Sequence, residues 1–491
     1  MIKKIWFLLF LMITLITSTF SLSKSYAIEL KAEGVTELQS FLSNDQMLKG
    51  AIAGISVRSA STGDILYSYN GETSLTPASS FKLFTAIASL TTLGPDYRFR
   101  TEIRTNGNVK KNGVLKGNLY IKGGGDPSLT VKDIESITKK LKEKGIRKIV
   151  GDLVADDTHY DKVRYSMDIP WSDETAYYGA QISALTVSPD EDYDAGTIIV
   201  QVKPSQKGRK PEVTIYPITD YVLVHNKAKT TEAGSKEKIN ITRGHGNNEV
   251  LIEGSIPEEG TLVKERISVW DPTRYTLALF KKELANQGID VKGNFITDKT
   301  PLNSKKLLLQ ESEPLSEILF PFLKLSNNTI AETLVKEMGQ LTKNQGTWEA
   351  GLETEKNALA QIGIEIDNTV FRDGSGISHV NTTQPNTLTL LLYRSQNKEW
   401  FPLMSKSLPV AGDKDKLIGG TLRKRMINSP LQQKVQAKTG TLTNVSSLTG
   451  YLQTNNGEKV IFSIILNHLQ DEEEGKVIEE KILSILLNGL E

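Results

Sequence analysis

Ser79 and Lys82, three residues apart, have the types and the spacing of an activated nucleophile. After Pro77, the stretch Leu83–Leu90 is apolar on nearly every side, which predicts a helix buried in the middle of a domain. Because residues three apart share a helix face, the Lys82 amine can reach the Ser79 hydroxyl. Burial disfavours the ammonium form, so Lys82 would be a usable base for removing the serine proton.

Two downstream motifs strengthen this prediction, since a serine and a lysine at this spacing also occur by chance. The second motif after Ser79 is Ser326-Asn327-Asn328, and the third is Lys438-Thr439-Gly440-Thr441. Taken singly, the second motif would suggest a helix cap or a loop, and the third a strand end before a bend. The three together resemble the active-site signature of penicillin-binding proteins and serine β-lactamases.

The chemistry that the first two motifs would support is acyl transfer from a peptide or amide to Ser79, and then to water. Lys82, if neutral, would take the hydroxyl proton during attack. Ser326 would relay a proton to the leaving amine. Asn328 would bind the substrate backbone and hold Lys82 in place.

The third motif is predicted to bind the substrate. Lys438 would supply a positive charge for a substrate carboxylate and ease deprotonation of its neighbours. Gly440 would leave room for a substrate strand, and Thr439 belongs to the same predicted substrate-binding set. The backbone N–H groups of Ser79 and Thr441 would form the oxyanion hole.

The start of the chain reads as a secretory signal peptide, residues 1–27. A basic start is followed by the apolar run Ile5–Ile16 and by small residues that end at Ala27. The alternative is an uncleaved membrane anchor, but the apolar run is short for a span. We therefore expect export across the cytoplasmic membrane into the cell-wall space, with at most peripheral membrane association.

Composition excludes several function classes. Cleavage after residue 27 would remove three lysines and leave 56 basic against 58 acidic residues, so no nucleic-acid partner is expected. Cysteine is absent, so large hydrophobic cores must stabilise an exported chain. The five histidines lie far apart in the sequence, and we expect neither a metal site nor a required cofactor.

Strand patterns at both ends of the chain predict one antiparallel sheet covered by helices, and hence an α+β fold. Hairpins are expected over residues 51–69 and 435–467, with a helix over Lys476–Leu490. The catalytic domain would then comprise residues 28–97 and 297–491. Two nested inserted domains would interrupt it: a β-rich one of residues 98–122 and 192–296, and a small α/β one of residues 123–191.

The separation of the first two motifs points to a family. From Ser79 to Ser326 there are 326 minus 79, or 247, positions, far more than one compact catalytic domain needs there. The chain from Ile28 to Glu491 resembles the class C low-molecular-mass penicillin-binding proteins, the D-alanyl-D-alanine carboxypeptidase/endopeptidase family of peptidase S13 type. Three further stretches are similar to ones typical of that family: Tyr120–Leu129, Tyr178–Leu185 and Asp373–Ser378.

This resemblance implies a substrate and an inhibitor. The substrate would be the D-Ala-D-Ala end of peptidoglycan stem peptides, and β-lactams would acylate Ser79. The family often has an arginine, thought to help bind the diaminopimelate side chain, where this sequence has His379. Histidine is mostly neutral at pH 7 and lacks the guanidinium fork, so we expect a subsite that is less demanding for a free carboxylate. Trp171, Asp173 and Tyr178 are further candidates for this subsite.

Parts of the sequence also match three other functions. A class A β-lactamase would use a glutamate in a Glu-x-x-x-Asn segment, and Glu353 to Asn357 matches; however, Trp348, Leu352, Leu359 and Ile362 form the buried face of that helix, which leaves Glu353 facing solvent. A non-catalytic wall-binding or β-lactam-sensing protein would need a lost motif. Membrane attachment by the C-terminal helix is disfavoured because that helix lacks a basic face. The balance of carboxypeptidase and endopeptidase action stays open.

Overall fold

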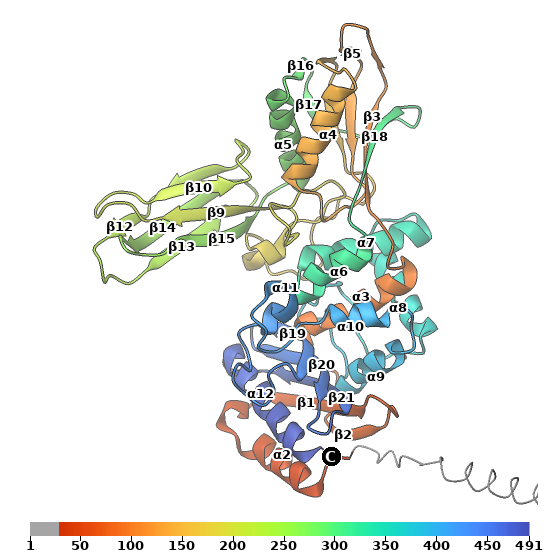
Figure 1. The fold of residues 1–491 in the computed structure, drawn as a ribbon, viewed down its shortest axis with the longest axis vertical. Coiled ribbons are helices and arrows are strands. Elements are labelled where there is room, and N and C mark those ends of the chain that lie inside the picture. Colours follow the sequence, from red (N-terminus) through yellow and green to blue (C-terminus); the bar gives the residue numbers. More distant parts are fainter. Residues whose placement is uncertain (1–28, 491) are drawn as a thin grey trace, which may run out of the picture.

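The computed structural model describes residues 29–490, in which a catalytic body carries an α/β unit and a β-rich arm (Figure 1). The predicted signal peptide, residues 1–27, lies outside the described residues. No helix between residues 29 and 490 is both long enough and apolar enough to cross a membrane.

The body is built on one antiparallel sheet whose strands come from the two ends of the chain, as predicted. Strand β1 (Ile52–Ser59) lies between β2 (Ile65–Tyr69) and β21 (Lys459–Asn467), and the order is β19-β20-β21-β1-β2. The remaining strands are β19 (Val435–Leu442) and β20 (Val445–Gln453). This order leaves β19 at an edge of the sheet.

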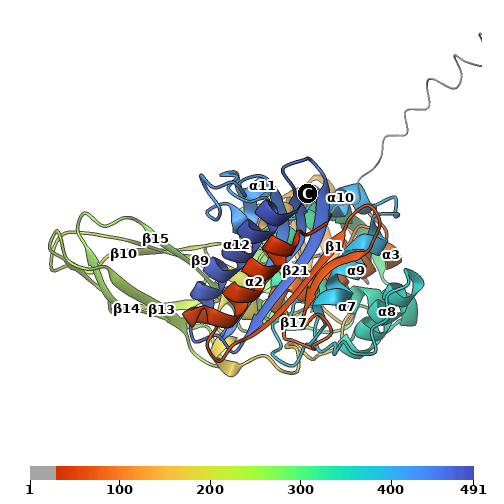
Figure 2. The same ribbon diagram turned by 90° about the horizontal axis from the view of Figure 1, so that it is seen from below.

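Helices cover both faces of this sheet, so its central strands are almost wholly buried. One face packs against α2 (Ala32–Asn44) and α12 (Glu472–Gly489), which lie side by side beneath the sheet (Figure 2). The helices of the other face contribute to a second core. They are α3 (Lys82–Thr92), α6 (Leu315–Lys324), α7 (Asn328–Lys343), α8 (Trp348–Gln361), α9 (Pro385–Ser395) and α10 (Phe401–Lys406).

The α/β unit contains strands other than those predicted for it. Strand β6 (Leu119–Lys122) pairs in parallel with β8 (Leu153–Asp156), and α4 (Val131–Glu143) is the crossover between them. The two sheets of the unit have the orders β17-β8-β6-β3-β18 and β16-β7-β5-β4. Their other elements are β3 (Arg100–Thr105), β4 (Asn108–Val109), β5 (Val114–Lys116), β7 (Lys148–Val150), α5 (Pro272–Asn286), β16 (Asp290–Val291), β17 (Phe295–Thr297) and β18 (Lys305–Glu311).

Residues 98–122 therefore belong with 148–156 and 290–311, and not with the β-rich domain to which the sequence analysis assigned them. Periodicity can indicate a strand, but it carries no information about which strand pairs with which. Parallel neighbours need a long crossover, and α4 supplies it here.

The β-rich unit is the smaller one, nested inside the α/β unit and projecting from it as an arm (Figure 1). It forms two sheets, one of order β10-β9-β15 and one in which β14 pairs with β11, β12 and β13. Its strands are β9 (Thr197–Lys203), β10 (Glu212–Tyr216), β11 (Leu223–Asn226), β12 (Lys229–Thr231), β13 (Lys238–Arg243), β14 (Glu249–Pro257) and β15 (Val263–Ser268).

Candidate active site

Ser79 lies in a short 3-10 turn, η2 (Ala78–Phe81), that leads directly into α3. Ala78 has a left-handed backbone with φ of 47°, which turns the chain sharply before the serine. Phe81 is fully buried, and its ring lies 5.0 Å from that of Phe371. The turn is thus anchored in the core while Ser79 itself stays partly exposed.

The Lys82 amine is directed at the Ser79 hydroxyl, as the spacing predicts. Its Nζ lies 2.9 Å from Ser79 Oγ, 2.6 Å from Asn328 Oδ1 and 2.7 Å from the Ser375 carbonyl oxygen. The contact with Asn328 joins the first and second motifs, which are far apart in the sequence. The role predicted for Asn328 in holding Lys82 agrees with this contact.

Electrostatics prepare Lys82 to act as a base. Burial lowers the pKa of its amine to about 7, although the negative charges of Glu332 and Asp373 act in the opposite direction. Glu332 is itself fixed by the backbone N–H groups of Gly374 and Ser375, at 3.0 and 2.8 Å. A substantial fraction of Lys82 is therefore neutral near pH 7.

Sequence reasoning gave no role to Glu332, Asp373 or Ser375. Asp373 is fully buried and accepts hydrogen bonds from Gly376 N and Ser378 N, and burial together with Glu332 raises its pKa to about 7. The sequence could have pointed to Glu332, because this carboxylate lies one helical turn after Asn328 on a helix that is otherwise buried.

The third motif completes the site. Lys438 Nζ donates to Ser326 Oγ at 2.8 Å and to the Thr439 carbonyl at 2.7 Å. Burial and the charge of Lys82 hold the pKa of Lys438 well below its usual value. Ser326 has a left-handed backbone with φ of 61°, a conformation that tertiary contacts must maintain. The three motifs thus meet around Ser79.

The structure requires a glycine at position 440 for a different reason from the one predicted. A Cβ at this position would lie 2.4 Å from Ser447 Oγ, 2.6 Å from the Pro77 carbonyl and 2.9 Å from Ser79 N. Glycine is therefore needed so that β19 can approach the backbone of the nucleophile turn, before any substrate is considered.

Strand β19 passes beside this turn at Gly440, and its outer edge pairs with no other strand of the sheet. The Ala437 N–H points outward to the Pro409 carbonyl, and in an antiparallel strand the same direction recurs at every second residue. The N–H of Thr441 therefore also points outward, on the strand that approaches Ser79 N. Thr439 Oγ1 donates to Thr421 Oγ1 at 2.8 Å, which ties this edge to η5 (Gly420–Leu422).

The remaining candidates for substrate binding belong to the inserted segment and to the loop before α9. Asn328 Nδ2 donates to the Tyr178 carbonyl at 2.9 Å, so the inserted segment borders the second motif. Asp173 ends the short turn η3 (Trp171–Asp173), and the Trp171 side chain is 79% exposed. His379 is exposed, and its carbonyl accepts a hydrogen bond from Thr76 Oγ1, three residues before Ser79.

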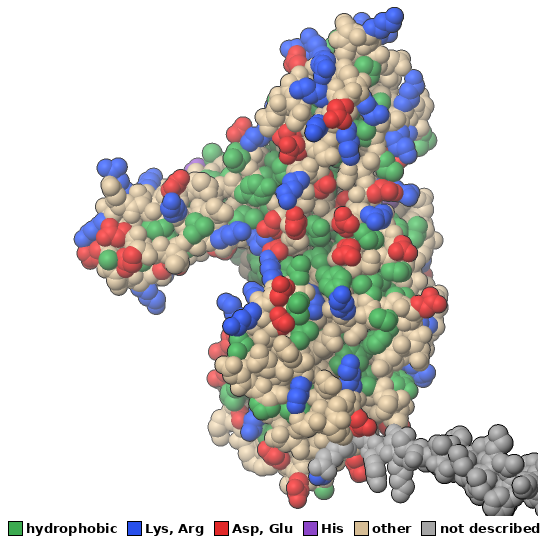
Figure 3. Space-filling model, viewed as in Figure 1, with side chains coloured by type: hydrophobic (Ala, Val, Ile, Leu, Met, Phe, Trp, Pro, Cys, Tyr) green, Lys and Arg blue, Asp and Glu red, His purple; other side chains and the backbone are tan. Residues whose placement is uncertain are grey.

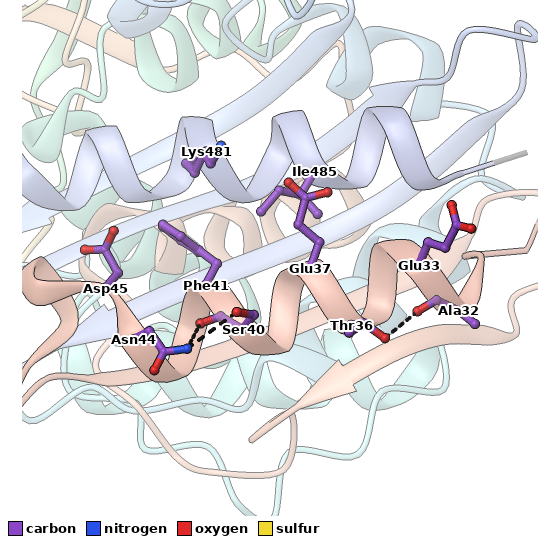
Figure 4. Close-up of a pocket in the computed structure, with 10 residues that line it drawn as sticks. All are labelled: Ala32, Glu33, Thr36, Glu37, Ser40, Phe41, Asn44, Asp45, Lys481 and Ile485. Carbon is purple, nitrogen blue, oxygen red and sulfur yellow. Dashed lines mark hydrogen bonds between the residues drawn. The ribbon is translucent and has the colours of Figure 1, made fainter.

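Other features lie away from the chemistry. Glu353 is exposed and pairs with Lys343, which agrees with its predicted place on the solvent side of α8. Within residues 29–490, no cluster of three or more histidine, aspartate or glutamate side chains is arranged to hold a metal ion. A groove of about 810 Å³ runs between α2 and α12, on the face of the sheet opposite α3 (Figure 4).

A partly exposed serine with a buried lysine base, on this helix-covered antiparallel sheet, defines a serine-type hydrolase with a penicillin-binding fold. The chain belongs to the D-Ala-D-Ala carboxypeptidase 3 (S13) family, which matches residues 35–488. It is 39% identical over 426 residues to the D-alanyl-D-alanine carboxypeptidase of Actinomadura sp. (strain R39), covering 86% of this chain and 79% of that protein.

Solved structures agree on the fold. Penicillin binding protein 4 from Haemophilus influenzae matches with a TM-score of 0.78 at 24% identity, covering 92% of this chain and 98% of that one. The same protein complexed with a novel β-lactam matches with a TM-score of 0.72, also at 24% identity, and covers 93% and 98%. The predicted family and α+β fold are therefore confirmed.

We expect Gly440→Ala to lower hydrolase activity much more than it lowers stability. The added methyl group would push on Ser79 N and the Pro77 carbonyl, and overpacking of this kind costs about 1–3 kcal/mol. Gly450→Ala is the matched control, because its methyl group would strain the same sheet against Gln436 and Ala437 instead. Activity should be compared with the unfolding temperature of each variant; equal activity losses would contradict this reading of Gly440.

Proposed function

We propose that the protein is a D-alanyl-D-alanine carboxypeptidase that works through an acyl-enzyme on Ser79. The observation that carries this proposal is the 2.9 Å contact between Ser79 Oγ and the buried amine of Lys82, whose pKa is about 7. A lysine in this state removes a proton at neutral pH, which the serine hydroxyl needs for attack.

The steps follow from the contacts. Lys82 takes the hydroxyl proton as Ser79 Oγ bonds to the penultimate D-alanyl carbonyl carbon, and the oxyanion lies between the N–H groups of Ser79 and Thr441. Ser326, hydrogen-bonded to Lys438, relays a proton to the departing amine: it gives up its hydroxyl proton as the C–N bond breaks and takes in return the proton that Lys82 removed from Ser79. Water then attacks the ester and restores Ser79.

The substrate fits the outer edge of β19. A stem peptide ending in D-Ala-D-Ala would add to this edge as an extended strand, and Thr439 and Thr441 would face its terminal carboxylate. The family and the carboxypeptidase name of the Actinomadura relative support this substrate. The β-lactam complex of the Haemophilus protein supports acylation by β-lactams.

The cellular setting follows from this substrate. Peptidoglycan lies outside the cytoplasmic membrane, so the enzyme must be exported, and residues 1–27 have the pattern of the signal that directs this. The same acyl-transfer chemistry would cleave a cross-link as well as a terminal residue, since both break a bond to a D-alanyl carbonyl.

The proposed acyl-enzyme should be detectable as a covalent adduct on Ser79. Brief exposure to benzylpenicillin should add one penicilloyl group to Ser79, and peptide mass spectrometry should locate it. Ser79→Ala should gain no mass and should not release D-alanine from a D-Ala-D-Ala peptide. A rapidly lost adduct with steady penicillin hydrolysis would indicate a β-lactamase, and an unmodified wild-type protein would overturn the proposal.

The rate of acylation should depend on pH. Because the pKa of Lys82 is about 7 and its neutral form is the base, the acylation rate should rise with pH and level off above about 7. Below that value it should fall about tenfold per pH unit as the amine becomes charged. Stopped-flow measurement of penicillin acylation between pH 5 and about 9 tests this.

Glu332→Gln provides the control for this profile. The Glu332 charge raises the pKa of Lys82. Removing this charge should therefore move the rise of the acylation rate to lower pH without abolishing that rise. A rise that stays at the same pH in this variant would mean that another group controls the rate.

We place His379 in the subsite for the stem-peptide side chain. Its ring lacks a permanent charge, so peptides with an amidated diaminopimelate should be accepted about as well as those with a free carboxylate. His379→Arg should raise the preference for the free carboxylate by about tenfold in kcat/KM, because a guanidinium pairs with it. Turnover of both peptides that is unchanged in His379→Ala and His379→Arg would remove His379 from the subsite.

A further inference from the structure

The middle residue of the second motif, Asn327, connects the catalytic body to the inserted segment. Its side-chain oxygen accepts hydrogen bonds from Ile330 N and Thr329 Oγ1, both at 2.9 Å, and so caps α7. Its side-chain nitrogen donates to Asp194 Oδ1 at 3.0 Å and to the Asp192 carbonyl at 3.1 Å. Every polar atom of this buried amide is therefore engaged.

Asp194 is fixed on its other side as well. It is 9% exposed, and its Oδ2 lies 3.2 Å from Arg266 Nε on β15, a charge contact without hydrogen-bonding geometry. Thr197 Oγ1 donates to the Asp194 carbonyl at 2.6 Å. The carboxylate thus stands between a cation of the arm and the amide of the second motif.

The same cation gathers two neighbouring carboxylates. Arg266 Nη2 pairs with Asp190 and, at 2.6 Å, with Asp192. Asp192 also receives the Lys416 amine from α11 (Lys416–Gly419). Acidic and basic side chains intermingle on this face, where the arm joins the body (Figure 3). The cluster joins the arm, the second motif and α11.

This arrangement bears on Ser326, the residue just before Asn327. Ser326 has the left-handed backbone noted above, which a serine does not adopt without support from its surroundings. The Asn327 N–H donates to the Phe322 carbonyl at 3.0 Å, and its side chain is held by Asp194. The peptide that carries Ser326 is therefore clamped directly after the strained residue.

We infer that Asp194 is a positioning residue, which through Asn327 aims the Ser326 hydroxyl at the leaving group. Asp194 touches no reacting atom. The inference rests on the proposed function, in which Ser326 donates a proton to the departing amine. It also gives the inserted segment a chemical role, since the carboxylate comes from outside the catalytic body.

The chemistry supplies a selective test. An amine is a poor leaving group unless it receives a proton as the C–N bond breaks, whereas the alkoxide of an ester departs with much less help. Misplacing Ser326 should therefore slow cleavage of a peptide ending in D-Ala-D-Ala more than cleavage of the ester analogue ending in D-Ala-D-lactate. A general loss of structure would slow both alike.

Asp194→Asn is the test variant. A carboxylate accepts from Asn327 and faces Arg266 at once, whereas an amide oxygen serves only one of them. We expect kcat/KM for the amide to fall about tenfold or more, and for the ester less than about threefold. Asp190→Asn is the matched control, because it weakens a contact with the same Arg266 but does not touch Asn327. Its amide-to-ester ratio should stay at the wild-type value.

A reciprocal exchange provides the second variant. Asn327→Asp keeps an N-cap oxygen for α7 but removes the donor to Asp194. The amide-to-ester ratio of kcat/KM should therefore fall in this variant as it does in Asp194→Asn. The double variant Asn327→Asp with Asp194→Asn restores one donor and one acceptor in reversed order, and its ratio should recover. Circular dichroism checks that each variant is folded.

The outcomes separate the two proposals. Wild-type protein that cleaves neither substrate would refute the proposed function. Wild-type protein that cleaves both, with Asp194→Asn lowering both in proportion or Asp190→Asn shifting the ratio equally, would overturn the positioning role of Asp194. Failure of the double variant to recover would overturn the direct link between Asp194 and Asn327.

Discussion

The structure depends on one buried amine, that of Lys82. A lysine amine without bulk water needs acceptors for its hydrogens, and Ser79, Asn328 and the Ser375 carbonyl provide three. These partners come from the nucleophile turn, from the second motif and from the loop after α8. Satisfying this one group therefore brings together segments that are separated by more than 200 positions in the sequence. Burial, which makes the site costly to build, also makes the amine a base at neutral pH.

The sheet explains why the third motif can join them. Strand β19 is an edge strand, so its outer backbone groups are available to a substrate, and a glycine at 440 lets it approach Ser79 N closely. Burial of both faces by helices leaves this edge as the accessible side of the sheet near the nucleophile. The register of β19 against β20 pairs Lys438 with Thr449, and a slip of one residue would turn Lys438 and Gly440 to the opposite face of the sheet. Lys438 is thereby held opposite Ser326.

The inserted units do more than extend the chain. The Tyr178 carbonyl accepts from Asn328, and Asp194 accepts from Asn327, so two residues of the second motif are fixed by atoms outside the catalytic body. A loop that carried Ser326 alone would have difficulty keeping a left-handed serine aimed at one point. Arg266 and Lys416 balance the charges of Asp194 and Asp192, and these aspartates hold Asn327, the residue after Ser326. Ser326 is thereby kept in one backbone conformation.

The sequence by itself determined the identities of Ser79, Lys82 and Lys438, the strands of the terminal hairpins and the buried helix after the nucleophile. These follow from residue type and periodicity, which are local. Only the tertiary structure decided that Val114–Lys116 and Leu119–Lys122 pair with the two strands after α4. It also decided that Gly440 is needed for backbone approach, and that Glu332 and Asp194 face the motifs. The reason is physical, because strand pairing depends on partners that are distant in the sequence. In addition, several of the acceptors in the site are backbone carbonyls, such as those of Ser375 and Tyr178, and residue type does not indicate where a backbone carbonyl will lie.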